Sequence, residues 1–402
     1  MQCRSCQTQT IKFLSLGDMP LVNLFLSSKQ LDSEKKYELT LAYCPKCHLV
    51  QLAKNVSPEI LFKDYIYFSS VSKTILEHAQ NTASTFIKRF KLDNNSLVFE
   101  IASNDGYLLQ YFQEKGIQVL GIDPAENIAE VANKKGIKTI PDFFCRGKAS
   151  ELKKLGIKPD VIFGANVLAH VPAIDDFAHG IFELLPKKGI AVFEFPYAGG
   201  LFEGKFDTIY HEHVFYYTLM AVKNVFSRAD LKVFDCEIIP MQGGSLRIFI
   251  CHIGVIEETP RLKKLLESEY TQGFDKLESY EKLGKKIAGI KMKLLSILDQ
   301  IKKKGQSIAA YSAPAKGLIL LNYFGITINY LDFIVDKAKE KQGLYTPGNH
   351  LMVYPVEKVL EDMPDYLLIL CWNIAEEVME QMGKYSTKGG KFIIPIPKPT
   401  II

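Results

Sequence analysis

LVFEIASNDGYLLQYFQEKGIQVLGIDP, residues 97–124, is the stretch that decides the fold. Its first apolar run ends in an acid, Glu100, and a loop of small and polar residues follows. A helical pattern comes next, and a second apolar run ends in Asp123. This order predicts a β-loop-α-β unit whose ligand lies at the carboxyl ends of the strands.

Glu100 indicates which ligand this unit takes. A dinucleotide site needs a glycine-rich turn whose N–H groups hold a pyrophosphate, and a carboxylate at its entrance would repel that anion. S-adenosylmethionine has no phosphate and carries an ammonium and a sulfonium. We therefore predict an S-adenosylmethionine site formed by Glu100 with Ala102, Ser103 and Asn104, and with Asp123 at the ribose hydroxyls. The alternative is an ordinary strand-turn-helix of an α/β domain.

Two further segments follow predicted strands at the same edge. Asp142 and Phe143 suit an adenine, as an acceptor for its amino group and a ring for stacking, although they suit a domain contact equally well. Asn166 and His170 follow the strand predicted at 160–164. We assign Asn166 to the cofactor, while His170 either faces the transferred methyl group or caps a helix.

The whole chain has 402 residues, 47% hydrophobic and 23% charged, with a net charge of +4. This length predicts two or three domains. No apolar run reaches the length of a membrane span, and the start MQCRSCQTQT lacks the features of a secretory signal, so we expect a cytoplasmic protein with reduced thiols. The basic residues are not clustered, which argues against a nucleic-acid partner. No obligate protein partner is evident.

Two C-x-x-C pairs near the N-terminus, Cys3 with Cys6 and Cys44 with Cys47, flank a stretch that we interpret as loop. Four cysteines in this pattern predict one tetrahedral zinc ion, with no open position for a substrate or water. The site is then structural. Disulfides do not suit the expected compartment, and a redox C-x-x-C would not need a second copy.

Alternating short apolar runs and helical patterns predict a doubly wound sheet over the middle of the chain. The strands are expected at 97–101, 118–122, 137–140, 160–164, 190–195, 231–239 and 246–252. A charged helical stretch follows, and from residue 305 a second α/β unit begins. We place the domains at 1–74 (zinc module), 75–255 (methyltransferase), 256–304 (helical connector) and 305–402 (second Rossmann-like domain).

The second unit repeats the strand-loop-helix order with a different loop, SAPAKG, at residues 312–317. This loop contains Lys316 and no acid, so it suits a phosphate-bearing ligand. The strand expected at 366–371 ends in Trp372 and Asn373. The alternative is a packing domain without a ligand.

Tyr210, His211, Glu212 and His213 lie together beyond the strand at 190–195. Histidine titrates nearest neutrality and is the natural general base. A neighbouring carboxylate can raise the pKa of the histidine and orient its ring, and a tyrosine hydroxyl can stabilise a developing enolate oxygen. A structural polar loop with hydrogen-bonded histidines is the alternative.

At these residues the chain resembles a known family, the sugar C-methyltransferases of deoxysugar biosynthesis, which methylate C-3 of nucleotide-linked 4-keto sugars. The resemblance runs nearly end to end. Beyond the four-cysteine segment it is carried by YIYFSSVS at 65–72, EIASNDG at 100–106, GIDPAENIAEVA at 121–132, NVLAHVP at 166–172, YHEH at 210–213, GGSLR at 243–247, SAPAKG at 312–317, LYTPGNH at 344–350 and LLILCWN at 367–373.

The resemblance implies a three-domain α/β enzyme: an N-terminal zinc-binding module, a class I S-adenosylmethionine-dependent methyltransferase domain, and a C-terminal domain contributing to the sugar-nucleotide site. His213 would remove the C-3 proton, Tyr210 and Glu212 would polarise or position the sugar, and His170 would lie nearby. The implied substrate is a dTDP-linked ketosugar. Its implied contacts are Tyr65, Tyr67, Ser69, Ser245, Ser312, Lys316, Trp372 and Asn373.

Two positions depart from the family pattern, because Ala102 and Ser312 stand where glycine is usual. Two other functions remain open from the sequence. One is an O- or N-methyltransferase of a sugar nucleotide, which needs no enolate. The other is a non-catalytic protein that binds a sugar nucleotide.

Overall fold

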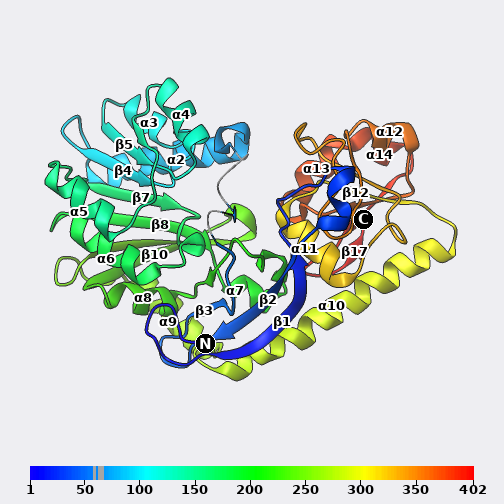
Figure 1. Cartoon of the computed structure of the whole chain (residues 1–402), viewed down its shortest axis with the longest axis horizontal. Coiled ribbons are helices and arrows are strands. Elements are labelled where there is room, and N and C mark those ends of the chain that lie inside the picture. The colour runs from blue at the N-terminus through cyan, green and yellow to red at the C-terminus, as the bar shows by residue number, and fades with distance from the viewer. Residues whose placement is uncertain (58–59, 62–67) are drawn as a thin grey trace.

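A computed structural model of the protein describes residues 1–57, 60–61 and 68–402. Figure 1 shows two lobes, with the N-terminal strands and the long helix α10 (Leu277–Lys303) running beneath both. Each lobe contains one largely parallel sheet, and a smaller antiparallel sheet lies between them near the N-terminus. The expected α/β architecture with two Rossmann-like units is confirmed.

The seven-stranded sheet of the first lobe contains the stretch quoted above. Its strands lie in the order β10 (Leu231–Ile239), β11 (Ser245–His252), β8 (Ile190–Pro196), β7 (Val161–Ala165), β4 (Leu97–Ile101), β5 (Gln118–Ile122) and β6 (Thr139–Ile140). Strands β4 to β8 are parallel, whereas β11 is antiparallel to both β8 and β10. The winding direction reverses between β4 and β7, so the crevice for a ligand lies at their carboxyl ends.

Alternate residues of the central strands pack into two different cores. Phe99 and Ile101 belong to one buried cluster, while Val98 belongs to the cluster on the other face. A strand with both faces buried needs apolar residues throughout, which explains the unbroken run at 97–99. Helices cover the faces: α2 (Lys73–Phe90), α3 (Leu109–Gln113), α4 (Glu126–Lys134), α5 (Arg146–Lys154), α6 (Ile174–Leu184) and α8 (Leu219–Ser227).

The N-terminal sheet has the order β1 (Ile11–Pro20), β2 (Lys36–Tyr43), β3 (Val50–Leu52) and β9 (Phe215–Tyr216), all antiparallel. The expectation of a loop between the two cysteine pairs was therefore wrong, because β1 and β2 form a hairpin there. Strand β9 brings the chain just beyond residue 213 onto this sheet. The 3₁₀ helix η1 (Ser28–Ser33) lies between β1 and β2.

The second lobe contains a six-stranded sheet. Its order is β14 (Val353–Tyr354), β13 (Phe333–Val335), β12 (Ile308–Tyr311), β15 (Tyr366–Ile369), β16 (Lys391–Ile394) and β17 (Thr400–Ile401), parallel except for β17. Its helices are α11 (Ala315–Phe324), α12 (Lys358–Asp362), α13 (Ala375–Gln381) and α14 (Gly383–Thr387), with the 3₁₀ helix η6 (Trp372–Ile374).

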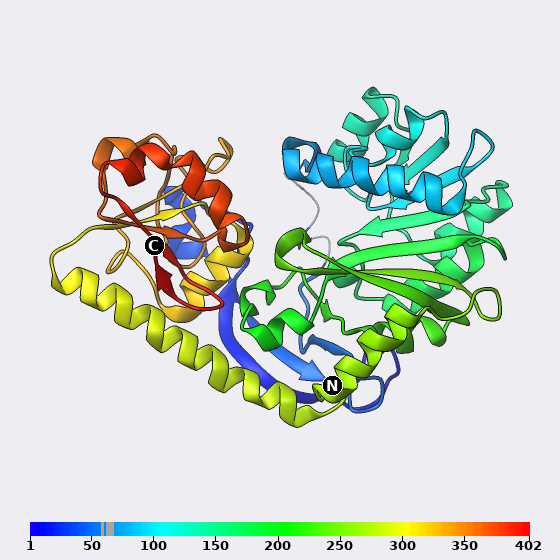
Figure 2. The ribbon, with the colours of Figure 1, turned by 180° about the vertical axis from the view of Figure 1, so that it is seen from behind.

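Two helices connect the lobes. Helix α9 (Pro260–Thr271) begins where the Thr259 side chain accepts the Leu262 N–H, and proline fits its first turn. Helix α10 follows and runs along the base of the molecule to the second lobe (Figure 2). Its buried residues recur every three or four positions, which gives one apolar face: Tyr280, Leu283, Ile287, Ile290, Leu294, Leu298 and Ile301.

One segment leaves the first lobe and reaches the other two sheets. After β8 come α7 (Gly199–Glu203) and the 3₁₀ helix η4 (Phe206–Thr208), and β9 follows. The ring of Phe206 packs against Tyr323 and Phe324 of α11, with centroid distances of 5.8 and 5.2 Å. The YHEH segment therefore lies where all three sheets meet. Further short elements are η2 (Ser69–Val71), η3 (Leu168–His170) and η5 (Met241–Gly243).

Candidate active site

Glu100 lies at the carboxyl end of β4, paired with β5 on one side and β7 on the other. Its side chain is fully buried, and among the described residues neither carboxylate oxygen has a hydrogen-bond partner. Burial, with the nearby charges of Asp123, Glu194 and Asp105, raises its pKa well above the usual value. A buried carboxyl without an internal donor fits a cationic ligand, such as the charged methionine end of S-adenosylmethionine.

The loop after β4 is held by Asp123. Its two carboxylate oxygens accept the N–H groups of Asn104 and Ala125, at 2.9 and 3.0 Å. Each oxygen keeps a second lone pair, so the residue still suits ribose hydroxyls. Ala102 and Asn104 both have left-handed backbone, with φ of 56° and 49°. A residue with a side chain is strained there, so glycine would suit position 102 better than alanine.

Ser103 contributes backbone rather than side chain to this loop. The residue is fully buried, and its N–H donates to the Ile122 carbonyl at 3.2 Å. Its hydroxyl packs so closely on Gly121 that a Cβ there would lie 2.3 Å from the oxygen. The side chain therefore packs between β4 and β5.

The adenine candidates follow β6, next to β5 and beyond Asp123. Phe143 is half exposed, so its ring can stack on a ligand. Asp142 forms an ion pair with Lys148 at 2.9 Å. Asn166, at the end of β7, has φ of 55° and donates its N–H to the Glu194 carbonyl at 2.7 Å. All three lie at the carboxyl edge that the sequence predicts.

His213 has a defined tautomer. Its Nδ1 lies 2.9 Å from the Thr208 carbonyl oxygen, and a carbonyl can only accept, so Nδ1 carries the proton. Its Nε2 therefore has the lone pair and accepts the Tyr210 hydroxyl at 2.9 Å. The two rings are also in contact, with centroids 4.1 Å apart and planes tilted by 36°. Tyr210 and His213 thus form a hydrogen-bonded acid–base pair.

The surroundings keep His213 neutral. Burial, together with His170 and Lys316, lowers its pKa well below the usual value. His170 packs edge-on against it, with ring centroids 5.0 Å apart, and burial lowers the pKa of His170 to about 4. At neutral pH both rings are free bases, which is the form that can accept a proton.

The pKa of Glu212 is shifted in the opposite direction from those of the two histidines. Burial raises its pKa to about 7, and a hydrogen bond from Asn23 opposes that rise. The Asn23 amide donates to the Glu212 Oε1 at 2.5 Å. A carboxyl that titrates near neutrality can donate a hydrogen bond in its protonated form.

The catalytic candidates adjoin the edge that contains Glu100. His170 belongs to η3, which follows β7, the neighbour of β4. The Val214 N–H donates to the Ala169 carbonyl at 2.7 Å, so the chain beyond His213 is anchored to η3. The structure therefore brings the predicted cofactor residues and the predicted base to one side of the sheet.

The predicted substrate residues have varied surroundings. Tyr65 and Tyr67 lie outside the described residues. The Ser69 N–H donates to the Asn104 side-chain oxygen at 2.8 Å, which places residue 69 beside the cofactor loop. Ser245 is buried, with its hydroxyl donating to the Met241 carbonyl at 3.1 Å.

The candidate residues of the second lobe include a loop after β12, which repeats the geometry of the loop after β4 in the first lobe. Asp336, after β13, accepts the N–H groups of Ala313 and Ala338 at 2.7 and 2.8 Å, as Asp123 does in its own loop. Ser312 has φ of 68°, so glycine is replaced in a left-handed position here too. Its hydroxyl donates to the Asp336 carboxylate at 3.2 Å.

Lys316 and Trp372 face the YHEH segment of the first lobe. Burial lowers the pKa of the Lys316 ammonium, and the Asp207 carboxylate opposes this effect. The Trp372 Nε1–H donates to Asp207 Oδ2 at 2.6 Å. Asn373, the next residue, is exposed.

Sequence reasoning missed three residues of this site: Asn23, Asp207 and Thr208. Asn23 contacts Glu212 from 189 positions away, and no local pattern marks it. Thr208 acts through its backbone carbonyl, which any residue has. Asp207 did leave a signal, because it is an acid between Phe206 and Ile209 in an aromatic-rich segment.

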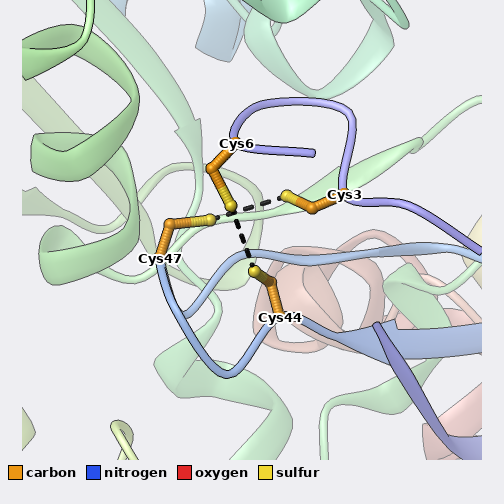
Figure 3. A group of neighbouring side chains, drawn as sticks. All are labelled: Cys3, Cys6, Cys44 and Cys47. Carbon is orange, nitrogen blue, oxygen red and sulfur yellow. Dashed lines mark hydrogen bonds between the residues drawn. The ribbon is translucent and has the colours of Figure 1, made fainter. Parts of the chain in front are cut away.

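The four cysteines form one cluster, shown in Figure 3. The Sγ atoms of Cys3 and Cys47 are 3.5 Å apart, those of Cys6 and Cys44 are 3.4 Å apart, and all four lie within 4.8 Å of one another. Tetrahedral zinc with Zn–S bonds of ~2.3 Å separates its sulfurs by about 3.8 Å, so this cluster fits zinc. Three of the cysteines belong to the core cluster of the first lobe, which makes the site structural.

These features define a class: a zinc-containing, S-adenosylmethionine-dependent methyltransferase. Three family models match in order, a zinc binding domain (residues 3–62), a methyltransferase domain (75–235) and a C-methyltransferase C-terminal domain (240–397). C-methyltransferase NovU of Streptomyces niveus is 30% identical over 405 residues, covering 100% of this chain and 96% of NovU. The chain belongs to this C-methyltransferase family.

Solved methyltransferases resemble parts of the chain. One from Clostridium acetobutylicum is 10% identical, with a TM-score of 0.36, over 44% of this chain and 92% of its own. One from Archaeoglobus fulgidus is 14% identical, with a TM-score of 0.36, over 44% of this chain and 93% of its own. In the described part of the chain, every helix is too short or too polar to cross a membrane.

Proposed function

We propose that the protein removes the C-3 proton of a dTDP-linked 4-keto deoxysugar and transfers a methyl group to that carbon, in branched deoxysugar biosynthesis. The observation that carries the proposal is the hydrogen bond between the half-buried Tyr210 and the buried, neutral His213, beside the cofactor edge. A carbon nucleophile must be made before it attacks a sulfonium, so carbon methylation needs such a base. The sugar substrate is inferred from the family resemblance of the sequence.

The chemistry of a 4-keto sugar suits this pair. The C-4 ketone acidifies the C-3 hydrogen, so one base and one donor to the enolate oxygen are enough. We assign the final proton position to His213 Nε2. The Tyr210 hydroxyl donates to that nitrogen. In the proposed step, the Tyr210 oxygen takes the proton from C-3 while the original phenol proton passes to His213 Nε2.

Glu212 supplies the donor in this scheme. With a pKa of about 7 it is largely protonated below neutrality, and its O–H donates to the oxygen that gains charge at C-4. Lys316 adds a positive charge from the second lobe.

Bound S-adenosylmethionine supplies an electrophilic methyl group on its sulfonium. Glu100 would provide the counter-charge for that cation, and Asp123 would accept hydrogen bonds from its ribose hydroxyls. Methylation at C-3 would take the methyl group from the sulfonium, which would leave as a thioether, and the proton held on His213 would pass to water. The four cysteine sulfurs would leave a bound zinc ion no open position for the reaction.

The test is mass spectrometry in heavy water, with methyl-labelled S-adenosylmethionine and dTDP-4-keto-6-deoxyglucose. The expected product gains one labelled methyl group and loses the C-3 hydrogen. With the cofactor omitted, deuterium should enter C-3. His213→Gln should slow both events by about 10²–10⁴-fold.

His211→Gln is the matched control, because His211 belongs to the same tetrapeptide but faces the Tyr37 carbonyl at 3.1 Å. It should keep both events. Methyl gain on oxygen or nitrogen without loss of the C-3 hydrogen would overturn the proposal, as would inactivity towards nucleotide-linked 4-keto sugars as a class.

A further inference from the structure

We propose that Asp207 is a positioning residue, which couples the tautomer of His213 to the second lobe through a hydrogen bond with Trp372. The coupling is a property of the structure itself. Its consequence for catalysis rests on the function proposed above.

Asp207 is an acid enclosed between the lobes. It belongs to η4, is 1% exposed, and accepts the Trp372 Nε1–H at Oδ2 over 2.6 Å. Its Oδ1 has no hydrogen-bond partner within the described ranges. Trp372 begins η6, directly after the β15 strand of the second-lobe sheet. A hydrogen bond to this buried carboxyl group therefore joins η4, which shortly precedes the YHEH segment, to that lobe.

The indole of Trp372 is itself fixed. A Cβ added at Gly243 would lie 2.9 Å from the ring, so η5 and the indole are in close contact. Lys205, two residues before Asp207, donates to the Gly243 carbonyl at 2.9 Å. The indole thus contacts η5, and its N–H donates to Asp207 of η4.

Asp207 acts on His213 through the next residue. The Thr208 carbonyl accepts the Nδ1–H of His213 at 2.9 Å, and the Thr208 hydroxyl lies 3.2 Å from the same nitrogen. A carbonyl at this place favours the tautomer whose Nε2 accepts a proton from Tyr210. If η4 moved by about 1 Å, this selection would weaken, and the Nε2–H tautomer cannot act as the base.

Lys316 lies near both Asp207 and His213. Its charge opposes the rise in the pKa of Asp207 that burial causes, and after burial and His170 it contributes to the lowered pKa of His213. The positioning role rests on the hydrogen bond to Trp372 rather than on the charge of Asp207, so Asp207→Asn should retain it.

The direct test reads the tautomer and needs no sugar. Long-range nitrogen–proton correlation spectra of histidine-labelled protein distinguish the two tautomers, and His213→Gln identifies the His213 signal by its loss. We expect the Nδ1–H form in the wild type and in Asp207→Asn, whose amide oxygen still accepts from the indole. In Asp207→Ala and Trp372→Phe, the Nε2–H form should become populated. An unchanged His213 signal in both variants would overturn the proposal.

The kinetic test uses deuterium exchange at C-3 of dTDP-4-keto-6-deoxyglucose. Asp207→Ala and Trp372→Phe should each lower kcat about 10-fold or more while KM changes little, and Asp207→Asn should recover most of the rate. Glu203→Ala is the matched control, because Glu203 is an exposed acid of the same segment, paired with Lys205 at 2.6 Å. A rise in KM alone, with kcat unchanged, would contradict a positioning role.

Folding is checked on the same samples. Trp372 is the single tryptophan of the chain, so its emission reports the lobe contact in every variant except Trp372→Phe. Trp372→Phe loses one ring of the indole together with the N–H, so it removes packing as well as the hydrogen bond. Asp207→Asn, which keeps the acceptor and the packing, is the variant that shows whether the hydrogen bond itself is needed. If no sugar shows exchange with the wild type, the proposed function fails, while the tautomer spectra still decide this inference.

Discussion

Replacing Glu100 by glutamine should abolish the proton release that accompanies binding of S-adenosylmethionine. The carboxyl is fully buried and unpartnered in the described chain, and Asp123, Glu194 and Asp105 add to the burial that raises its pKa. Without cofactor it therefore keeps its proton at pH values where an exposed glutamate has lost it. A bound cation favours the carboxylate, so binding releases that proton.

The magnitude follows from one group. While free Glu100 is protonated and bound Glu100 is ionised, affinity should rise up to about tenfold for each pH unit, which is about 1.4 kcal/mol. The same proton affects folding in the opposite direction. Between the ordinary value of 4.5 and the raised folded pKa, the folded state holds a proton that the unfolded state has lost, so the free energy of unfolding falls as pH rises.

The assay is titration calorimetry of S-adenosylmethionine in two buffers of different ionisation enthalpy. The wild type should release close to one proton per site, and Glu100→Gln should release none while binding more weakly at every pH. Asp142→Asn is the control, because it alters the adenine end without touching Glu100. Equal proton release by the wild type and Glu100→Gln would refute the role assigned to this carboxyl.

Four shorter predictions concern other parts of the site. Methyl transfer should decline above about pH 7 as Glu212 ionises, and Glu212→Gln should remove this decline because its amide donates at any pH. Asn23→Ala removes the donor that lowers the pKa of Glu212, so the decline in the rate–pH profile should move to higher pH. Cys44→Ser should abolish zinc binding, measured by metal analysis, and lower the unfolding free energy by several kcal/mol, on the order of 5, whereas Cys145→Ser, at an exposed cysteine, should do neither. Ala102→Gly should relieve about 1–2 kcal/mol of left-handed strain, offset by about 0.4–1 kcal/mol of added freedom in the unfolded chain, so the free energy of unfolding measured in urea should rise by up to about 1.6 kcal/mol.

Much of the fold could be predicted because its strands are marked at both ends. The strands expected at 97–101 and 118–122 match β4 and β5 to the residue, since polar loops bound both apolar runs. The hairpin near the N-terminus was missed because two irregularities in the pairing of β1 with β2 break its alternation of buried and exposed residues. A sequence pattern of period two cannot be read through such bulges.

The site could be predicted only in part, for a different reason. Glu100 could be proposed because it is a titratable group at a strand end, and the YHEH residues because four proton-carrying side chains follow one another in the sequence. The contacts that set their chemistry join distant positions: Asn23 with Glu212, and Trp372 with Asp207. The tautomer of His213 depends on a backbone carbonyl, and no residue type encodes that.

Glu100 and Glu212 explain why burial alone does not define a role. Both carboxyls are buried and both have raised pKa values, yet the proposed reaction needs one charged and the other neutral. The difference lies in what each meets when the ligands bind. Glu100 has no hydrogen-bond donor among the described residues, and in the proposed complex it would meet a cation, which would lower its pKa. Glu212 meets a carbonyl oxygen that gains negative charge, which raises its pKa further as the enolate forms. In the proposed reaction, cofactor binding would ionise Glu100 while enolate formation would keep Glu212 protonated, so both carboxyls could act at the same pH.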